Sequence, residues 1–324
     1  MKQISPYYLF YIKGTAKAKS NFDVDLKEAA DYLSKALEYK ETEAAFNQLA
    51  IVYAKIDDVD MYEKTILRGA DAGFKVFYSS CGLFYASNIK KVNEALSLEW
   101  FNKGIEGKEP KAYSDLAKLY MTGCAAFKPD YDKAEKLLFE ALALNDKKWN
   151  GYFAWSLGFL LYEKKMYKQA AQYYKKAIDY GHKDATFNLA LMYRDGIGVK
   201  KDSEKYMEYL MMNLSKDNAV EIAGVYLTNQ FTPPDEDVAF MYFQYAASKG
   251  HPVAAIMCAA FLIDRKVNNE KLINNYFEIA FKNGMTDENL KNHYDQIEQE
   301  LGIGVSHKLK ELSEKYWNMR RSEA

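Results

Sequence analysis

The sequence predicts an all-α fold, a right-handed α/α solenoid of about eight helix-turn-helix repeats closed by a C-terminal tail of capping helices. Three observations predict it. Helix breakers are scarce among the 324 residues, which include 6 Pro and 17 Gly. A motif that ends in a small residue recurs at gaps of 33 to 37 residues. A second apolar motif with helical spacing lies between successive copies of the first.

The first motif marks the second helix of each repeat, helix B. It has two large apolar or aromatic residues, two spacers and a small residue, as in residues 173–177. This spacing places the large and small residues on one helix face, where the small residue lets a neighbouring backbone approach closely. The small residue or its equivalent stands at Ala36, Gly69, Gly104, Ala141, Ala177, Asn213, Ala246 and Ala280.

The second motif marks the first helix, helix A. It reads apolar, small, spacer, apolar and usually Tyr, and its copies cover 49–53, 81–85, 116–120, 157–161, 189–193, 222–226 and 258–262. Four glycines stand four residues after a helix-B small residue. They predict left-handed helix ends, where glycine carries no steric penalty. These glycines are Gly73, Gly181, Gly250 and Gly284.

The motifs divide residues 1–284 into eight repeats and leave 285–324 as two capping helices split at 302–304. A polar end helix is what a stacked array needs to cover its last core. The first repeat begins at Ser5 and Pro6, a helix cap followed by proline at the first helical position. The repeats are expected near 5–40, 41–73, 74–108, 109–145, 146–181, 182–216, 217–250 and 251–284.

Composition argues against several classes of function. The 44 basic and 45 acidic residues nearly cancel, so no basic surface for nucleic acid or an anionic membrane is expected. The longest apolar run, 253–263, is about half of the roughly 20 residues that a membrane span needs. The Tyr-rich N-terminal stretch lacks a signal-peptide cleavage site. We therefore expect a cytoplasmic protein with no membrane association.

No pattern of catalytic or metal-binding residues is visible. Cys81 and Cys258 fall on apolar helix faces and are expected to be buried, while Cys124 lies in a loop without a nearby base. His182 and His251 follow helix-ending glycines in repeats too far apart to share a metal. The sequence therefore predicts a protein that is not an enzyme and has no catalytic residue, no metal and no cofactor.

Gly196 and Gly198 resemble part of a phosphate-binding loop. Such a loop must follow a strand and open a helix, whereas this one follows a predicted helix. We interpret it as the turn between the two helices of one repeat.

Residues 185–202 resemble a Sel-one-like repeat, a member of the tetratricopeptide-type helical solenoids. The pattern is an Ala, then Phe-Asn-Leu, a Tyr, a Gly-x-Gly-Val loop and an Asp before helix B, with Ala190 where the family usually has Gly. The repeat at 109–145 keeps a weaker form, and 217–250 has a loop of similar length. The repeats at 41–73, 74–108, 146–181 and 251–284 look more like plain tetratricopeptide repeats. Tyr206 and Asn213 depart from the expected alanines.

The resemblance implies a scaffold or adaptor that binds a protein or peptide partner. In arrays of this type the A helices line the concave face. The inward positions are then six and three residues before the helix-A small residue, and one and four after it. They give Tyr152, Trp155, Phe159 and Tyr162 in one repeat, and Asp184, Phe187, Leu191 and Arg194 in the next.

Aromatic residues and arginine dominate binding energy at interfaces, so we expect partner contacts at these positions except Asp184. The alternative is that several of them, Phe187 above all, belong to the core. A bacterial effector or defence-complex subunit, and a hydrolase built on the scaffold, remain alternative functions.

The N-terminal segment is an alternative binding surface. Basic residues, Lys13 and Lys17 among them, alternate there with aromatic residues such as Tyr7 and Tyr8, and no acid precedes Asp23. Such a segment suits an acidic partner or nucleic acid. It equally suits a capping helix packed on the first repeat.

Overall fold

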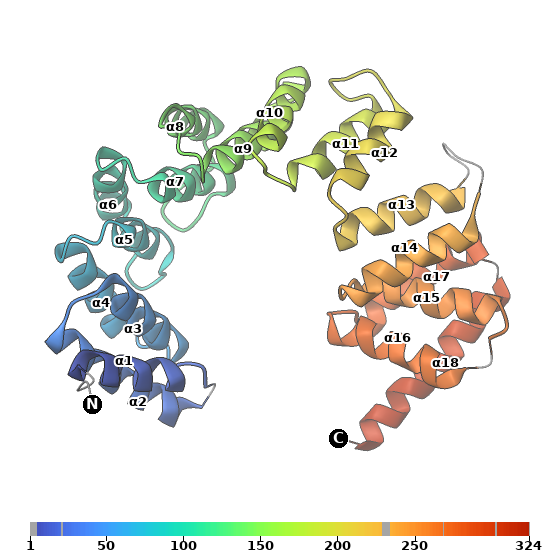
Figure 1. Cartoon of the computed structure of the whole chain (residues 1–324), viewed down its shortest axis with the longest axis horizontal. Helices are drawn as coiled ribbons and strands as arrows, with labels where there is room; N and C mark the ends of the chain where they lie inside the picture. Colours follow the sequence, from blue (N-terminus) through green and yellow to red (C-terminus); the bar gives the residue numbers. More distant parts are fainter. Residues whose placement is uncertain (1–4, 21, 229–233, 268, 302, 324) are drawn as a thin grey trace. The chain divides into compact units, whose positions relative to one another are not determined.

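The computed structural model describes residues 5–20, 22–228, 234–267, 269–301 and 303–323 (Figure 1). These residues form eighteen α-helices and no strand, so the predicted all-α repeat fold is confirmed. The helices are α1 (Pro6–Lys17), α2 (Asp23–Tyr39), α3 (Glu43–Lys55), α4 (Val59–Asp71), α5 (Val76–Ser87), α6 (Glu94–Glu106), α7 (Pro110–Thr122), α8 (Tyr131–Ala143), α9 (Asn150–Glu163), α10 (Tyr167–Asp179), α11 (Ala185–Asp195), α12 (Ser203–Met212), α13 (Lys216–Thr228), α14 (Glu236–Ser248), α15 (Pro252–Asp264), α16 (Glu270–Lys282), α17 (Asp287–Leu301) and α18 (Ile303–Glu323).

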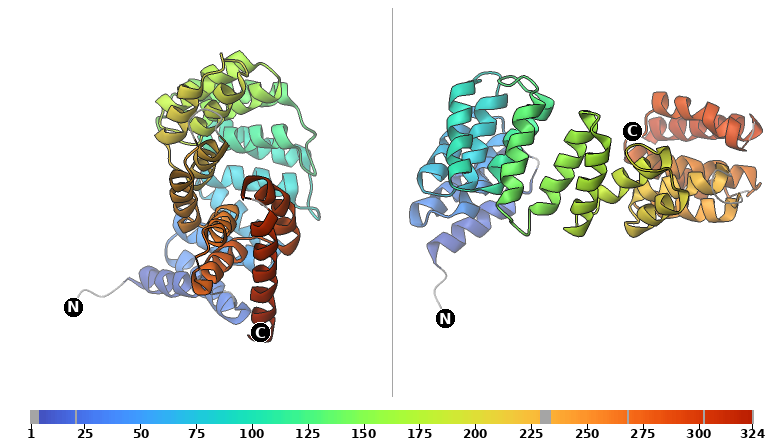
Figure 2. Two further views of the ribbon diagram at one scale, coloured as in Figure 1. Left: turned by 90° about the vertical axis from the view of Figure 1, so that its right-hand side faces the viewer. Right: turned by 90° about the horizontal axis from the view of Figure 1, so that it is seen from above.

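The chain divides into two compact units, Met1–Met166 and Tyr167–Ala324. Within the first unit each helix from α1 to α9 packs against the next, and the same holds from α10 to α16 in the second (Figures 1 and 2). Odd-numbered helices from α3 to α15 carry the helix-A motif, and even-numbered helices from α2 to α16 carry the helix-B motif. Where each repeat begins and ends stays a prediction.

The small residues of the helix-B motif lie where the next helix A crosses closely. A Cβ atom on Gly104 would lie 2.6 Å from the Cβ of Ala112 in α7, and one on Gly69 would lie 2.7 Å from the ring of Phe77 in α5. The alanines of the same motif are fully buried. Nearly all side-chain volume is therefore excluded from these crossings, and larger residues fill the space around them.

Helix ends follow the sequence signals. Gly73, Gly181, Gly250 and Gly284 have φ values of 84°, 86°, 77° and 97°, which confirms the predicted left-handed positions. α1 begins at Pro6, as expected. Several helices begin with a side chain that accepts a hydrogen bond from the first turn. These caps are Thr42, Asp58, Asn93, Asp130, Asp202, Asp235, His251 and Asn269.

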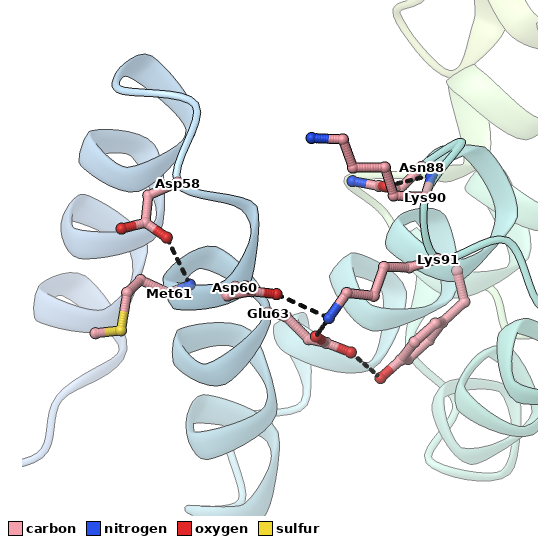
Figure 3. Close-up of polar contacts among 8 residues, drawn as sticks. Asp58, Asp60, Met61, Glu63, Asn88, Lys90 and Lys91 are labelled. Atoms are coloured by element: carbon pink, nitrogen blue, oxygen red, sulfur yellow. Dashed lines mark hydrogen bonds and ion pairs between the residues drawn. The ribbon is translucent and has the colours of Figure 1, made fainter.

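A polar cluster joins α4 to the segment that follows α5 (Figure 3). The ammonium of Lys91 contacts Asp60 Oδ1 at 2.9 Å and Glu63 Oε2 at 2.7 Å, and the Tyr85 hydroxyl donates to Glu63 Oε1 at 2.8 Å. The hydrogen bonds to Glu63 and Asp60 raise the pKa of Lys91. Burial, together with the bond to Glu63, raises the pKa of Tyr85 to about 12. Consecutive repeats are thus joined by polar contacts as well as by their core.

The C-terminal helices cover the last repeat. α17 and α18 pack on α15, and α18 also contacts α16. Leu290 of α17 and Leu309 of α18 are almost fully buried in the same core as Phe277 of α16. α17 ends at Leu301 and α18 begins at Ile303, so Ile303 and Gly304 of the expected break belong to α18, while Gly302 lies outside the described residues. That residues 285–324 act as a cap stays a prediction.

The neutral form of His251 caps the N-terminus of α15. Its Nδ1 accepts a hydrogen bond from the Ala254 N–H at 3.2 Å, and its Nε2 lies 3.5 Å from Asp217 Oδ1. Burial lowers the pKa of His251 below the ordinary 6.5, against the smaller opposing effect of Asp217. Protonation would turn the capping acceptor into a donor, so the cap requires neutral histidine.

We predict that Gly104→Ala destabilises the protein. The new Cβ would clash with a Cβ that is fixed to the α7 backbone, which forces two helices apart. The expected loss in the free energy of unfolding is about 1–3 kcal/mol, larger than the gain from alanine's helix propensity. Urea denaturation followed by circular dichroism measures it.

Gly224→Ala is the matched control, because a Cβ on this α13 residue would meet nothing within 4 Å. It should raise the free energy of unfolding by about 0.5–1 kcal/mol. If both substitutions stabilise, close helix approach at Gly104 is not a constraint.

We also predict that acidification destabilises the Tyr167–Ala324 unit. The lowered pKa of His251 means that the unfolded chain binds a proton more readily below pH 6.5. The contribution of neutral His251 to the free energy of unfolding is therefore fully present above pH 6.5. It is lost as the pH falls toward the pKa that His251 has in the folded protein. His251→Asn keeps a capping side chain without a titrating group, as Asn269 does in α16. Denaturation midpoints at about pH 7.5 and 5.5 should then differ less than in the wild type. An equal difference in both proteins would contradict this role.

Candidate partner-binding surface

A pocket of about 370 Å³ opens between the A helices α7 and α9 of the Met1–Met166 unit. Tyr152, Trp155 and Phe159 of α9 line one side of it. Their rings follow one another along the helix, with centroids 5.8 Å apart for Tyr152 and Trp155 and 6.4 Å apart for Trp155 and Phe159. Phe159 is 39% exposed, whereas the other two are half-buried. The remaining lining residues are Ser114, Ala117, Lys118, Met121, Thr122, Leu138 and Ser156.

The repeat register explains both walls of the pocket. Relative to the small residue Gly158, the three aromatic lining residues of α9 stand at six and three positions before it and one after it. Relative to Ala117, three lining residues of α7 occupy matching positions: Ser114 three before it, Lys118 one after it and Met121 four after it. The sequence analysis predicted the lining residues of α9 but not those of α7, because inward positions were assigned in two repeats only. The same rule finds both.

Lys118 supplies the charge at this pocket. It is exposed, and its ammonium makes no ion pair with any residue that the structure describes. The nearby carboxylate of Asp115 is already engaged, because it accepts hydrogen bonds from the Ser79 hydroxyl and the Lys111 ammonium. The pocket therefore combines an aromatic wall with an available cation.

A second pocket, of about 280 Å³, lies among α11, α13 and α15 in the Tyr167–Ala324 unit. Arg194 lines it. The guanidinium contacts Asp195 through two nitrogens at 2.9 and 3.1 Å, and Glu221 Oε2 at 3.3 Å. The other lining residues are Tyr206, Val220, Glu221, Gly224, Val225, Leu227, Thr228, Phe243, Val253 and Met257.

Arg194 is held within the fold by this network. The hydrogen bonds to Asp195, followed by the charge of Glu221, raise its pKa despite partial burial. The hydroxyl of Tyr206, which is 1% exposed, donates to the same oxygen of Glu221 at 2.9 Å. Tyr206 stands where four other B helices, α2, α8, α10 and α14, have alanine, and this departure is the sequence signal for the buried network.

The expected contact residues are thus distributed over the two units. Tyr152, Trp155 and Phe159 share one pocket, and Arg194 lines the other. Tyr162, Phe187 and Leu191 are half-buried and line neither pocket. Residues at inward positions of the repeat register therefore do not all line a pocket.

Two of the three thiols lie in the core, and the third bonds to the backbone. Cys81 and Cys258 are fully buried, as predicted, and burial raises the pKa of each to about 12. The Cys124 thiol donates to the Ala86 carbonyl. Neither pocket is lined by a histidine. Within the described residues, no group of three or more His, Cys, Asp or Glu side chains is placed to hold a metal ion.

The glycine loop after α11 is shaped by packing. A Cβ on Gly198, whose φ is 72°, would lie 2.5 Å from the backbone of Tyr167. This close approach accounts for the glycine without any phosphate. Across the described residues, no helix has both the length and the apolar character that crossing a membrane requires.

Two of the solved structures that resemble this chain show the extent of the likeness. A Sel1 repeat protein from Oxalobacter formigenes is 21% identical with a TM-score of 0.61, over 89% of this chain and 87% of that one. A protective antigen present in uropathogenic Escherichia coli strains, which displays an SLR fold, is 16% identical with a TM-score of 0.51, over 98% of this chain and 69% of that one. These likenesses support the helical-repeat fold.

The family model of the Sel1 repeat matches this chain at 80–108, 110–146, 158–182, 183–209 and 223–251. Two of these matches fall in the expected repeats 74–108 and 146–181, so the interpretation of those two as plain tetratricopeptide repeats was wrong. Their short turns concealed a family pattern that their helices retain. Sel1-repeat proteins are generally scaffolds for protein interactions. The five matches show that this chain carries Sel1 repeats, and its fold resembles that of a solved Sel1 repeat protein.

Proposed function

We propose that this protein is a protein-interaction scaffold that binds a peptide or helix of another protein at the pocket between α7 and α9. The observation that supports this site is the row of Tyr152, Trp155 and Phe159 beside an open volume of about 370 Å³. Partly exposed aromatic rings next to such a volume leave apolar surface in contact with water. A partner that covers this surface gains the free energy of its burial.

The pocket also indicates the chemistry of its occupant. Full burial of one Leu, Met or Phe side chain contributes about 1.5–3 kcal/mol, and the aromatic wall suits such a side chain. Lys118 favours a carboxylate beside it. A rim ion pair contributes at most about 1 kcal/mol, so it orients the partner more than it holds it. We therefore propose a segment that carries a large apolar residue next to an acidic one.

A scaffold is favoured over a hydrolase by the placement of the titratable groups. One histidine–carboxylate pair, His251 with Asp217, has its histidine Nδ1 engaged in capping α15. The raised thiol pKa values leave Cys81 and Cys258 protonated at neutral pH. We propose a cytoplasmic location because all three thiols are unpaired. Action as an effector or defence-complex subunit would use the same surface.

We predict that Trp155→Ala combined with Tyr152→Ala weakens partner binding at least about tenfold, because truncation of central aromatic residues removes most of the buried contact. Affinity purification with mass spectrometry identifies the partner, and calorimetry on the purified pair measures the dissociation constant. Circular dichroism checks that the variant remains helical.

Trp100→Ala is the matched control. Trp100 is a half-buried tryptophan of the same unit on helix B, α6, where it stacks on Tyr78. Its loss should leave the dissociation constant unchanged. Equal weakening by both variants, or none by the double variant, would place the binding surface elsewhere.

A further inference from the structure

Gly224 lies in the interior of α13 without a close helix crossing to require it. A Cβ on Gly69, Gly82 or Gly104 would lie 2.6 or 2.7 Å from an atom of a neighbouring helix, whereas one on Gly224 would meet nothing within 4 Å. Glycine inside a helix is destabilising relative to alanine, because it loses more conformational freedom on folding. Packing does not offset this cost at Gly224. Such exceptions to the local rules are expected where a residue serves binding.

Gly224 opens the pocket of about 280 Å³ that lies among α11, α13 and α15. It lines this pocket and stands one residue after Ala223, the helix-A small residue of its repeat. The A helices from α3 to α11 each carry a longer side chain at the same register position. These side chains belong to Ile51, Leu83, Lys118, Phe159 and Leu191. Because a longer side chain at Gly224 would project into the pocket, the glycine keeps the pocket open.

The pocket has an apolar floor. Val225, Phe243 and Met257 line it and are 3%, 3% and 4% exposed, and half-buried Val220 and Leu227 add to the apolar lining. The volume is just below the roughly 300–1,000 Å³ of sites that take a whole small molecule. The pocket therefore suits one long side chain, whose methylene groups would leave water on contact with this floor.

One carboxylate of the lining retains the capacity to accept a hydrogen bond. The Arg194 guanidinium contacts both oxygens of Asp195, at 2.9 and 3.1 Å, but reaches Glu221 through one longer contact of 3.3 Å to Oε2. The Tyr206 hydroxyl donates to the same Oε2. Neither contact involves Oε1 of Glu221, and this side chain is 34% exposed. Arg194 is thus shared between two carboxylates and does not fully neutralise Glu221.

The charge of Glu221 favours a cationic side chain with a long apolar stem. Lysine has four methylene groups that pack on apolar surface and an ammonium that a single oxygen can accept. Arginine binds a carboxylate best through two parallel bonds, and Oε2 is already engaged. Lys201, whose charge also acts on Asp195, does not line the pocket and so does not supply this cation.

We propose that the pocket among α11, α13 and α15 is a second docking site, which takes a lysine side chain of a partner protein. The lysine stem packs on the apolar floor beside Gly224, and its ammonium donates a hydrogen bond to Oε1 of Glu221. The site lies in the Tyr167–Ala324 unit and does not depend on the α7–α9 pocket, where Lys118 favours an acidic residue. The two pockets thus select segments of opposite charge.

Titration of the full chain with short peptides tests this chemistry. Met257 lies on the pocket floor, so its ¹³C-labelled methyl signal, assigned from a Met257→Leu variant, reports occupancy by nuclear magnetic resonance. The peptide acetyl-Ala-Ala-Lys-Ala-Ala-amide should shift this signal saturably, with a dissociation constant of about 1 mM. The same peptide with norleucine in place of lysine should bind about fivefold more weakly, because it lacks the ion pair. Equal affinity of the two peptides, or no saturable shift, would overturn the proposal.

Variants of the two central residues separate the pocket from the fold. Gly224→Leu introduces the residue that α5 and α11 carry at this position, so it should fold and abolish binding of the lysine peptide. Gly224→Ala, which is expected to be more stable than the wild type, should already weaken binding several-fold. Glu221→Gln keeps an acceptor for the Tyr206 hydroxyl without the charge, so the lysine and norleucine peptides should bind it alike.

Glu208→Gln is the matched control, because it removes the same charge from an exposed position of α12 outside the pocket. It should keep the preference for the lysine peptide. Urea denaturation checks that each variant is folded. Undiminished binding to both Gly224 variants, or a lysine preference that persists in Glu221→Gln, would show that the pocket does not recognise lysine in this way.

Discussion

The close crossing of each helix B with the following helix A is the constraint on which both units depend. At Gly104 and Gly69 the approach leaves no room for a side chain, and the alanines of the same motif are fully buried. Because the crossing recurs at a nearly constant interval, the same packing between neighbouring helices is repeated along the chain. Large aromatic residues near each crossing, such as Phe101 beside Gly82, fill the volume that the small residues leave. Stability is therefore distributed over many similar contacts between neighbours.

Departures from the small-residue rule are where the repeats acquire individual chemistry. Tyr206 of α12 stands where four other B helices have alanine, and its buried hydroxyl donates a hydrogen bond to Glu221 of α13. Glu221 in turn is balanced by Arg194 of α11. One substitution thus draws charged residues from two neighbouring helices into a shared network. The repeat register predicts Arg194 as a binding residue, but these ion pairs hold its guanidinium within the fold.

The same repetition defines which surfaces stay open. Inside the array each A helix loses one side to the preceding helix B, so its remaining free positions recur in register from repeat to repeat. In α7 and α9 these positions carry aromatic residues, Met121 and Lys118, and the space between them is a pocket.

The sequence by itself determined the repeat length, the helix ends and the helical class, because these follow from local spacing, glycine conformation and capping side chains. It also determined which α9 residues share a helix face. Only the tertiary structure decided that Tyr152, Trp155 and Phe159 line a pocket while Tyr162, Phe187 and Leu191 do not, since a pocket depends on which side chains of the neighbouring helices stand opposite each position. The tertiary structure likewise determined that Arg194 is ion-paired. Its partner Asp195 is the next residue in the sequence, but its partner Glu221 lies 27 residues away. Periodicity specifies the direction in which a side chain points, and packing between helices specifies what it meets there.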